Sequence, residues 1–153
     1  MKAPTLAFAR LESVASAYVL VLSERPPDEA DWASWVAYIA EHISPETAPR
    51  VLVVTEGGSP SAAQRASLSR VTERHRHAAK VAVCTDSALA RGAITALSWF
   101  MPNAYRAFSR GALDDAAHYL DLSAASLEVA ALARTLRRRL DATSTSTERA
   151  AGS

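Results

Sequence analysis

The chain has 153 residues and a formal net charge of +1, so no strong overall charge draws it toward nucleic acid or an anionic membrane. Hydrophobic residues make up 49% of the sequence, enough for the core of one domain, and no apolar run reaches the ~20 residues that span a bilayer. A single cysteine, Cys84, excludes an internal disulfide and a cysteine-cluster metal site. The start of the chain lacks a signal-peptide pattern, so we expect a soluble cytoplasmic protein without cofactor or metal.

The first part of the chain predicts a β-hairpin followed by a helix. Thr5 to Glu12 alternates roughly between apolar and polar residues, as a half-buried strand does, and Ala17 to Ser23 is more completely apolar. A short turn joins them, so the two strands should pair antiparallel. After two prolines, Asp28 is the expected N-cap of a helix that runs to about His42 or Ile43. The buried stripe of that helix contains Trp32, Trp35, Val36, Ile39 and Ile43.

The rest of the chain alternates strands with helices. Strands are expected at Val51 to Thr55, Val81 to Thr85 and Tyr105 to Ser109. Helices are expected from Ala62 to about His77, Ala88 to about Met101, Gly111 to Leu120, and Ser123 or 124 to about Leu140. Residues 142–153 are rich in Ser and Thr and poor in apolar residues, which predicts a disordered tail. This order predicts one α/β domain over residues 1–141, with a mixed, mostly parallel five-stranded sheet and helices packed on it.

Four segments carry a resemblance to a known family. They read VLVVTEGG (Val51 to Gly58), KVAVCTDS (Lys80 to Ser87), RGAITALSWF (Arg91 to Phe100) and YRAFSRGALDDAAHYL (Tyr105 to Leu120). With the opening hairpin, they resemble the STAS fold of sulfate transporter and anti-sigma-factor antagonist domains. The resemblance is closer to the stand-alone bacterial STAS-like, SEC-fourteen-like proteins, and it covers roughly Leu6 to Leu122. It implies a regulatory or scaffolding interaction domain without intrinsic catalysis.

In that family, the phosphorylated residue lies in an Asp-Ser-Ser/Thr-Gly motif after the third strand. This chain has Glu-Gly-Gly-Ser-Pro-Ser there, so Ser59 and Ser61 are equivalent only in position. Two interpretations of this turn stay open. Its N–H groups, at Gly57, Gly58, Ser59 and Ser61, form an anion site or phospho-site at the start of a helix. Alternatively, the glycines only permit the turn, and Ser59 or Ser61 caps the helix.

Polar residues follow two expected parallel strands. Glu56 and the pair Asp86 and Ser87 should share one rim, because ligands of open α/β sheets gather outside the carboxyl ends of the strands. Glu56 with Asp86 would suit acid/base catalysis, whereas helix capping by Asp86 or Ser87 is the competing interpretation. Since no histidine is expected on this rim, an enzyme that uses the two carboxylates is only the third functional hypothesis.

Two other features favour structural interpretations. Cys84 lies inside an apolar strand, which indicates a buried, inert thiol. The run Arg137 to Arg139 falls at the expected end of the last helix, where cations complement the macrodipole and a solvated helix end is the expectation.

The segment Gly92 to Met101 reads GAITALSWFM and is apolar on most sides of its helix, so something must cover its second side. Three alternatives for what covers this side stay open: the C-terminal helix of the same chain, a protein partner or second copy, and a small apolar ligand. We expect a non-enzymatic protein-interaction or regulatory module, self-associating or docking a partner through Leu97, Trp99, Phe100 and Met101. A carrier or sensor of a lipid or other small hydrophobic ligand is the alternative.

Overall fold

The computed structural model describes residues 3–75, 78–100 and 104–152, and for residues 96–100 it describes only the backbone. Five strands form one sheet, in the spatial order β1-β2-β3-β4-β5. They are β1 (Leu6–Arg10), β2 (Ala17–Leu22), β3 (Arg50–Thr55), β4 (Lys80–Cys84) and β5 (Tyr105–Phe108). β1 pairs antiparallel with β2, and all other pairs are parallel. The predicted mixed, mostly parallel sheet with an opening hairpin is confirmed, with β3 at its centre.

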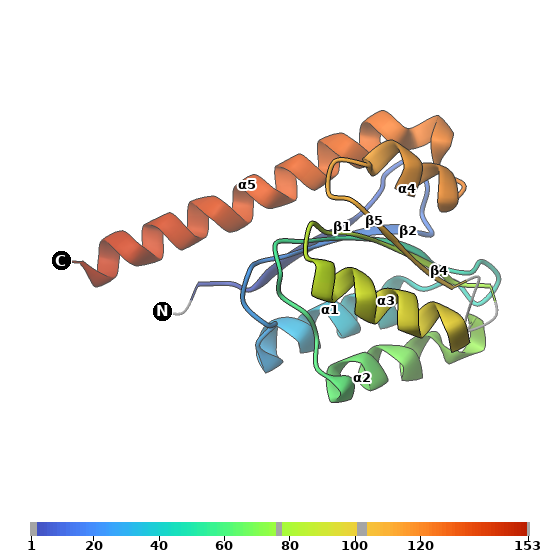
Figure 1. The fold of residues 1–153 in the computed structure, drawn as a ribbon, viewed down its shortest axis with the longest axis horizontal. Helices are drawn as coiled ribbons and strands as arrows, with labels where there is room; N and C mark the ends of the chain where they lie inside the picture. The colour runs from blue at the N-terminus through green and yellow to red at the C-terminus, as the bar shows by residue number, and fades with distance from the viewer. Residues whose placement is uncertain (1–2, 76–77, 101–103, 153) are drawn as a thin grey trace.

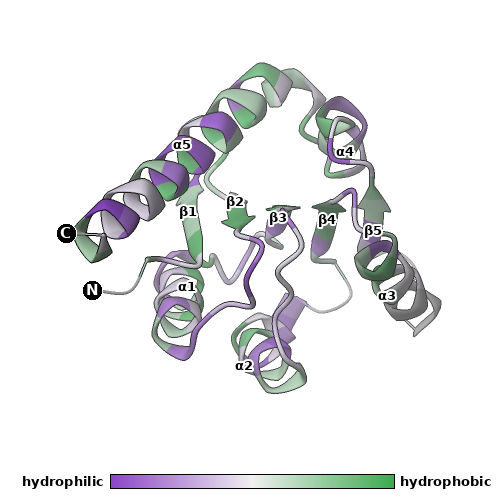
Figure 2. Cartoon of the chain, turned by 60° about the vertical axis from the view of Figure 1, so that its left-hand side comes forward, coloured by the Kyte–Doolittle hydropathy of each residue, from purple (hydrophilic) through white to green (hydrophobic). Residues whose placement is uncertain are grey.

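Helices cover both faces of the sheet (Figure 1). They are α1 (Glu29–His42), α2 (Ala62–Thr72), α3 (Ala88–Phe100), α4 (Leu113–Tyr119) and α5 (Ser126–Ala151), with short 3₁₀ turns η1 (Glu73–His75) and η2 (Ser123–Ala125). The parallel strands β2 to β5 advance in one direction, so right-handed crossovers place α1, α2 and α3 on one face. Figure 2 shows α4 and α5 on the other face.

Each face has its own core. One packs the aromatic side of α1 on the sheet: Trp35 is fully buried against Tyr18 and Phe8. The other packs α4 and α5 on the opposite face, through Leu120 and Leu136. Every residue of β2 is buried because the strand has neighbours on both edges and helices on both faces.

The helix starts follow the predicted capping residues. Asp28 caps α1, and its carboxylate accepts a hydrogen bond of 2.8 Å from the backbone N–H of Asp31. Ser61 caps α2 in a capping box: its hydroxyl accepts from the N–H of Gln64 at 3.1 Å, and the Gln64 side chain accepts from the N–H of Ser61 at 2.9 Å. The α2 helix ends at Thr72, earlier than expected, and the chain continues as η1.

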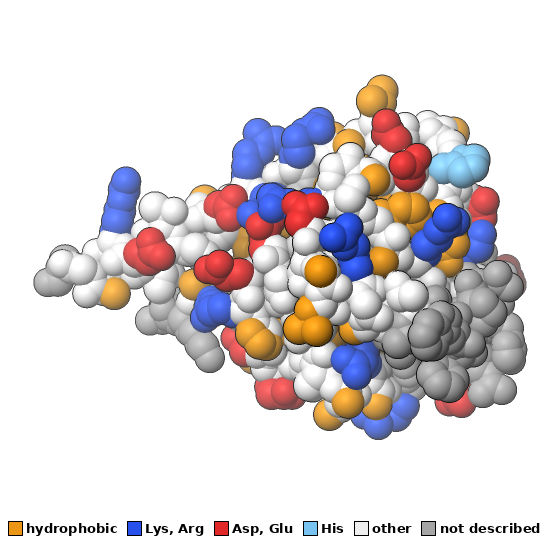
Figure 3. Space-filling model, viewed as in Figure 1, with side chains coloured by type: hydrophobic (Ala, Val, Ile, Leu, Met, Phe, Trp, Pro, Cys, Tyr) orange, Lys and Arg blue, Asp and Glu red, His pale blue; other side chains and the backbone are white. Residues whose placement is uncertain are grey.

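The prediction of a disordered tail over residues 142–153 is wrong, because α5 continues from Leu140 to Ala151. The serines and threonines at 143–147 each donate their hydroxyl to the carbonyl four residues earlier; Thr143 donates to Arg139 and Ser144 to Leu140. Leu140 is the last buried residue of the helix, and beyond it the helix leaves the sheet (Figures 1 and 3).

Candidate functional site

The turn after β3 is a compact hydrogen-bonded unit. The hydroxyl of Thr55 accepts from the N–H of Gly57 at 3.1 Å and donates to the carbonyl of Gly58 at 2.6 Å. The N–H of Gly58 donates to the carbonyl of Ser23 at 2.9 Å. Gly57 has φ of +137°, a conformation that residues with a side chain rarely adopt. The two glycines therefore permit the turn and its contact with the chain after β2.

The two serines of the turn differ in their roles. Ser61 and Ser59 are both exposed, but the hydroxyl of Ser61 is engaged as the cap of α2. The N–H groups of Gly57, Gly58 and Ser61 all donate within the chain. A bound anion would have to displace these hydrogen bonds, so the geometry favours the structural interpretation of this turn.

The turn after β4, like the turn after β3, is fixed by hydrogen bonds within the chain. The hydroxyl of Ser87 accepts from the N–H of Ala90 at 3.2 Å, which caps the start of α3 as the sequence suggested. The N–H of Ser87 itself donates to the hydroxyl of Thr85 at 3.1 Å. Asp86 is exposed, and one of its carboxylate oxygens accepts from the backbone N–H of Arg110 at 3.2 Å.

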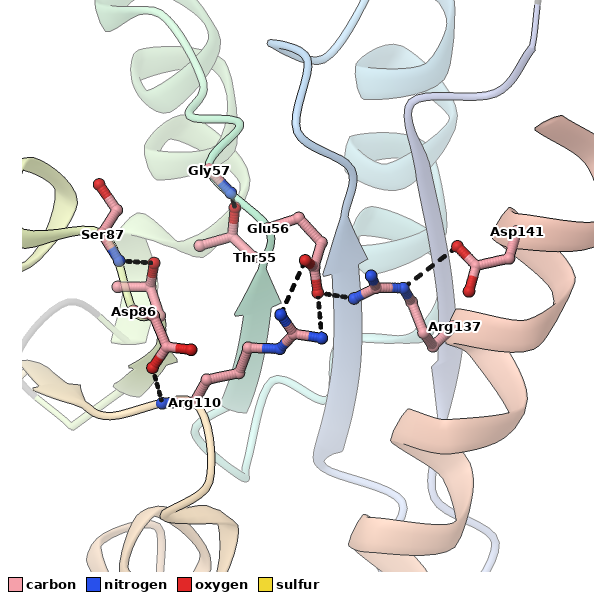
Figure 4. Close-up of polar contacts among 9 residues, drawn as sticks. Thr55, Glu56, Gly57, Asp86, Ser87, Arg110, Arg137 and Asp141 are labelled. Carbon is pink, nitrogen blue, oxygen red and sulfur yellow. Dashed lines mark hydrogen bonds and ion pairs between the residues drawn. The ribbon is translucent and has the colours of Figure 1, made fainter.

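Glu56 is the centre of an ion-pair network on this rim (Figure 4). The two terminal guanidinium nitrogens of Arg110, from the loop between β5 and α4, contact its carboxylate, at 2.8 and 2.7 Å. Arg137 of α5 contacts the same carboxylate from the other side and also pairs with Asp141 at 3.2 Å. The Glu56 side chain is only 18% exposed. A single carboxylate thus joins the central strand to two segments that are distant in sequence.

The structure brings Glu56 and Asp86 to one rim, with Arg110 contacting both. It also adds Arg110 and Arg137, which no local sequence pattern assigns to this site. Arg137 is not at a solvated helix end: the helix continues for more than three turns beyond it, and its side chain is 28% exposed. One sequence signal was present, because Arg137 directly follows the buried Leu136, at the border of the apolar stripe of α5.

The apolar helix α3 lies along the edge strand β5, and α5 crosses β1 and β2 on the opposite face (Figure 2). The interpretation that the C-terminal helix covers α3 is therefore wrong. Leu97, Trp99 and Phe100 lie in α3, but their side chains are outside the described part of the structure, and Met101 is outside it altogether. In the described half of α3, Leu89 is 86% exposed. Figure 3 shows hydrophobic side chains at the surface over this part of the helix.

Cys84 lies on β4 beneath α4, fully buried. Burial raises the pKa of its thiol to about 12, so the reactive thiolate is scarce at neutral pH. We expect the native protein at pH 8 to react hardly at all with Ellman's reagent. Once unfolded in guanidinium chloride, it should release one equivalent of the yellow 2-nitro-5-thiobenzoate. Rapid stoichiometric reaction of the native protein would contradict this burial.

Across residues 3–75, 78–100 and 104–152, no group of His, Cys, Asp and Glu side chains comes together in a way that could hold a metal ion. Within the same ranges, no helix is both long enough and apolar enough to cross a membrane. In comparisons with protein-family models, with curated proteins and with solved structures, nothing matches this chain.

Proposed function

We propose that the protein is a non-enzymatic, STAS-like interaction module that associates with a second copy of itself through α3. The observation that carries this proposal is the position of α3. It is an apolar helix that lies over the edge strand β5, on the opposite face from α5, with Leu89 at its start exposed. A single exposed leucine is ordinary, but here it belongs to a helix with few polar residues.

The rim geometry supports a function without acid/base catalysis. A general acid or base must reach a proton on its substrate, and its carboxylate must be able to change protonation state. The carboxylate of Glu56 instead contacts two guanidinium groups, which occupy its oxygens in place of a substrate. Asp86 is exposed, and its carboxylate accepts a hydrogen bond from the backbone N–H of Arg110. This contact fixes the loop after β5.

The fold supports the STAS-like part of the proposal, since an opening hairpin followed by parallel βα units is the architecture that the resemblance implied. We also propose that the protein is cytoplasmic. Ser59 remains exposed at the position where the family carries its phosphorylated residue, so a partner that recognises this turn would reach it directly.

The substitution Leu89→Asp tests the association. Leu89 is the second residue of α3, where a negative charge suits the helix dipole, so the monomer should remain folded. We expect light scattering on a sizing column to show a dimer for the wild type and a monomer for this variant. The matched control is Leu127→Asp on α5, because Leu127 is equally exposed at 85%. If Leu127→Asp dissociates the dimer and Leu89→Asp does not, the interface is not on α3.

A further inference from the structure

A groove with a volume of about 490 Å³ opens on the face of the sheet that carries α1 and α2. Its lining comes from α2, from the end of α1 and from the amino ends of β3, β4 and β5. Helix α2 packs against α1 and forms one wall of the groove, while α3 lies along β5 and contributes none of the described lining. Its volume falls within the roughly 300–1,000 Å³ of small-molecule sites.

The sheet side of this groove is apolar. Val51, Val81 and Tyr105 come from three neighbouring strands, and Ile39 of α1 adjoins them. Burial raises the pKa of the Tyr105 hydroxyl, and the charge of Arg65 partly opposes that rise. The hydroxyl is therefore neutral at physiological pH and keeps its proton for donation.

The helix side of the groove is more polar, with Ser69, Thr72 and the oppositely charged Arg70 and Glu73. Arg70 and Glu73 both line it and are both exposed, and in the described parts of the chain neither forms an ion pair. Helix α2 and the η1 turn together carry Arg65, Arg70 and Arg74 against the single carboxylate of Glu73, although only Arg70 and Glu73 of these line the groove. The net positive charge of this segment favours an anionic group beside Arg70.

We infer that the groove binds a small amphipathic anion. Its apolar body lies against Val51, Val81 and Tyr105, and its carboxylate or sulfonate pairs with Arg70. Burial of the apolar body supplies most of the affinity, and the exposed Arg70 adds selectivity for the anionic end. This site is separate from the exposed start of α3, so a failed dimer test and a failed ligand test are distinguishable.

Decanoate, kept below its micelle concentration, is a suitable probe, with decanol as its neutral counterpart. We expect decanoate to shift the ¹H–¹⁵N NMR signals of α2 and of the starts of β3 and β4, while signals of α4 and α5 stay in place. Decanol should bind the same residues about 2- to 5-fold more weakly, the effect of one exposed ion pair. No binding by decanoate, shifts centred elsewhere, or equal affinity for decanol would each overturn the proposal.

Two matched pairs of variants locate the contacts. Ala66 and Ala63 are both exposed on α2, but only Ala66 lines the groove. Ala66→Trp should therefore weaken decanoate binding at least about 10-fold, whereas Ala63→Trp should leave it unchanged. Arg70→Gln should lower decanoate affinity to that of decanol, whereas Arg74→Gln should have less effect. Equal effects within either pair would overturn the assignment.

Discussion

Replacing Gly58 with alanine should destabilise the protein by about 3 kcal/mol, although the change adds only one methyl group. A Cβ at this position would lie 2.2 Å from the carbonyl oxygen of Arg25 and 2.5 Å from that of Ser23. Both obstacles are backbone atoms, so no side chain can rotate away. The N–H of Gly58 donates to the same Ser23 carbonyl, and relief of the clash would break this hydrogen bond.

Thermal unfolding followed by circular dichroism measures this effect, which should lower Tm by roughly 6–12 °C in a chain of this size. Gly92→Ala is the control. Gly92 lies in α3, and a Cβ there would meet no atom within 4 Å. Alanine should stabilise that helix by up to about 1 kcal/mol. A Gly58→Ala variant as stable as the wild type would show that the two chain segments do not approach as closely as described.

The second large effect is expected from Glu56→Gln, which should cost about 2–3 kcal/mol of folding stability. The substitution keeps the shape of the side chain but removes the negative charge between Arg110 and Arg137. Two guanidinium groups are then left facing each other at a position where the central side chain is largely buried. The cost is lower than for a fully buried pair because both arginines retain access to water.

Urea unfolding curves for Glu56→Gln and Asp141→Asn separate the network from an ordinary surface pair. The side chain of Asp141 is 65% exposed, so losing its contact with Arg137 should change stability by no more than about 0.5 kcal/mol. A double variant, Glu56→Gln with Arg137→Met, should recover part of the loss, because one of the two unpaired cations is gone. Equal, small effects of Glu56→Gln and Asp141→Asn would mean that Glu56 does not tie α5 to the sheet.

Much of the fold follows from local patterns. The continuous apolar run of β3 predicts a central strand, and the cap residues Asp28 and Ser61 mark the starts of α1 and α2 because a side-chain oxygen must satisfy the free N–H groups there. The end of α5 could not be predicted in this way. Serine and threonine favour coil on average, yet residues 143–147 satisfy their hydroxyls on the helix itself.

The ion-pair network could not be predicted from local sequence patterns either, for a different reason. Arg110 and Arg137 each lie more than fifty residues from Glu56 in sequence. The loop after β5 brings Arg110 to it, and the packing of α5 against β1 and β2 brings Arg137. The sequence does place Glu56 at the end of a buried strand. A carboxylate in that position requires a cation nearby, but the sequence offers seventeen Lys and Arg residues from which to choose.

The molar mass of the wild-type chain in solution, measured by light scattering over a range of concentrations, is the most direct test of the proposed self-association. We expect a mass that rises with concentration to twice the 16.3 kDa of one chain. A mass of 16.3 kDa at every concentration would contradict self-association through α3.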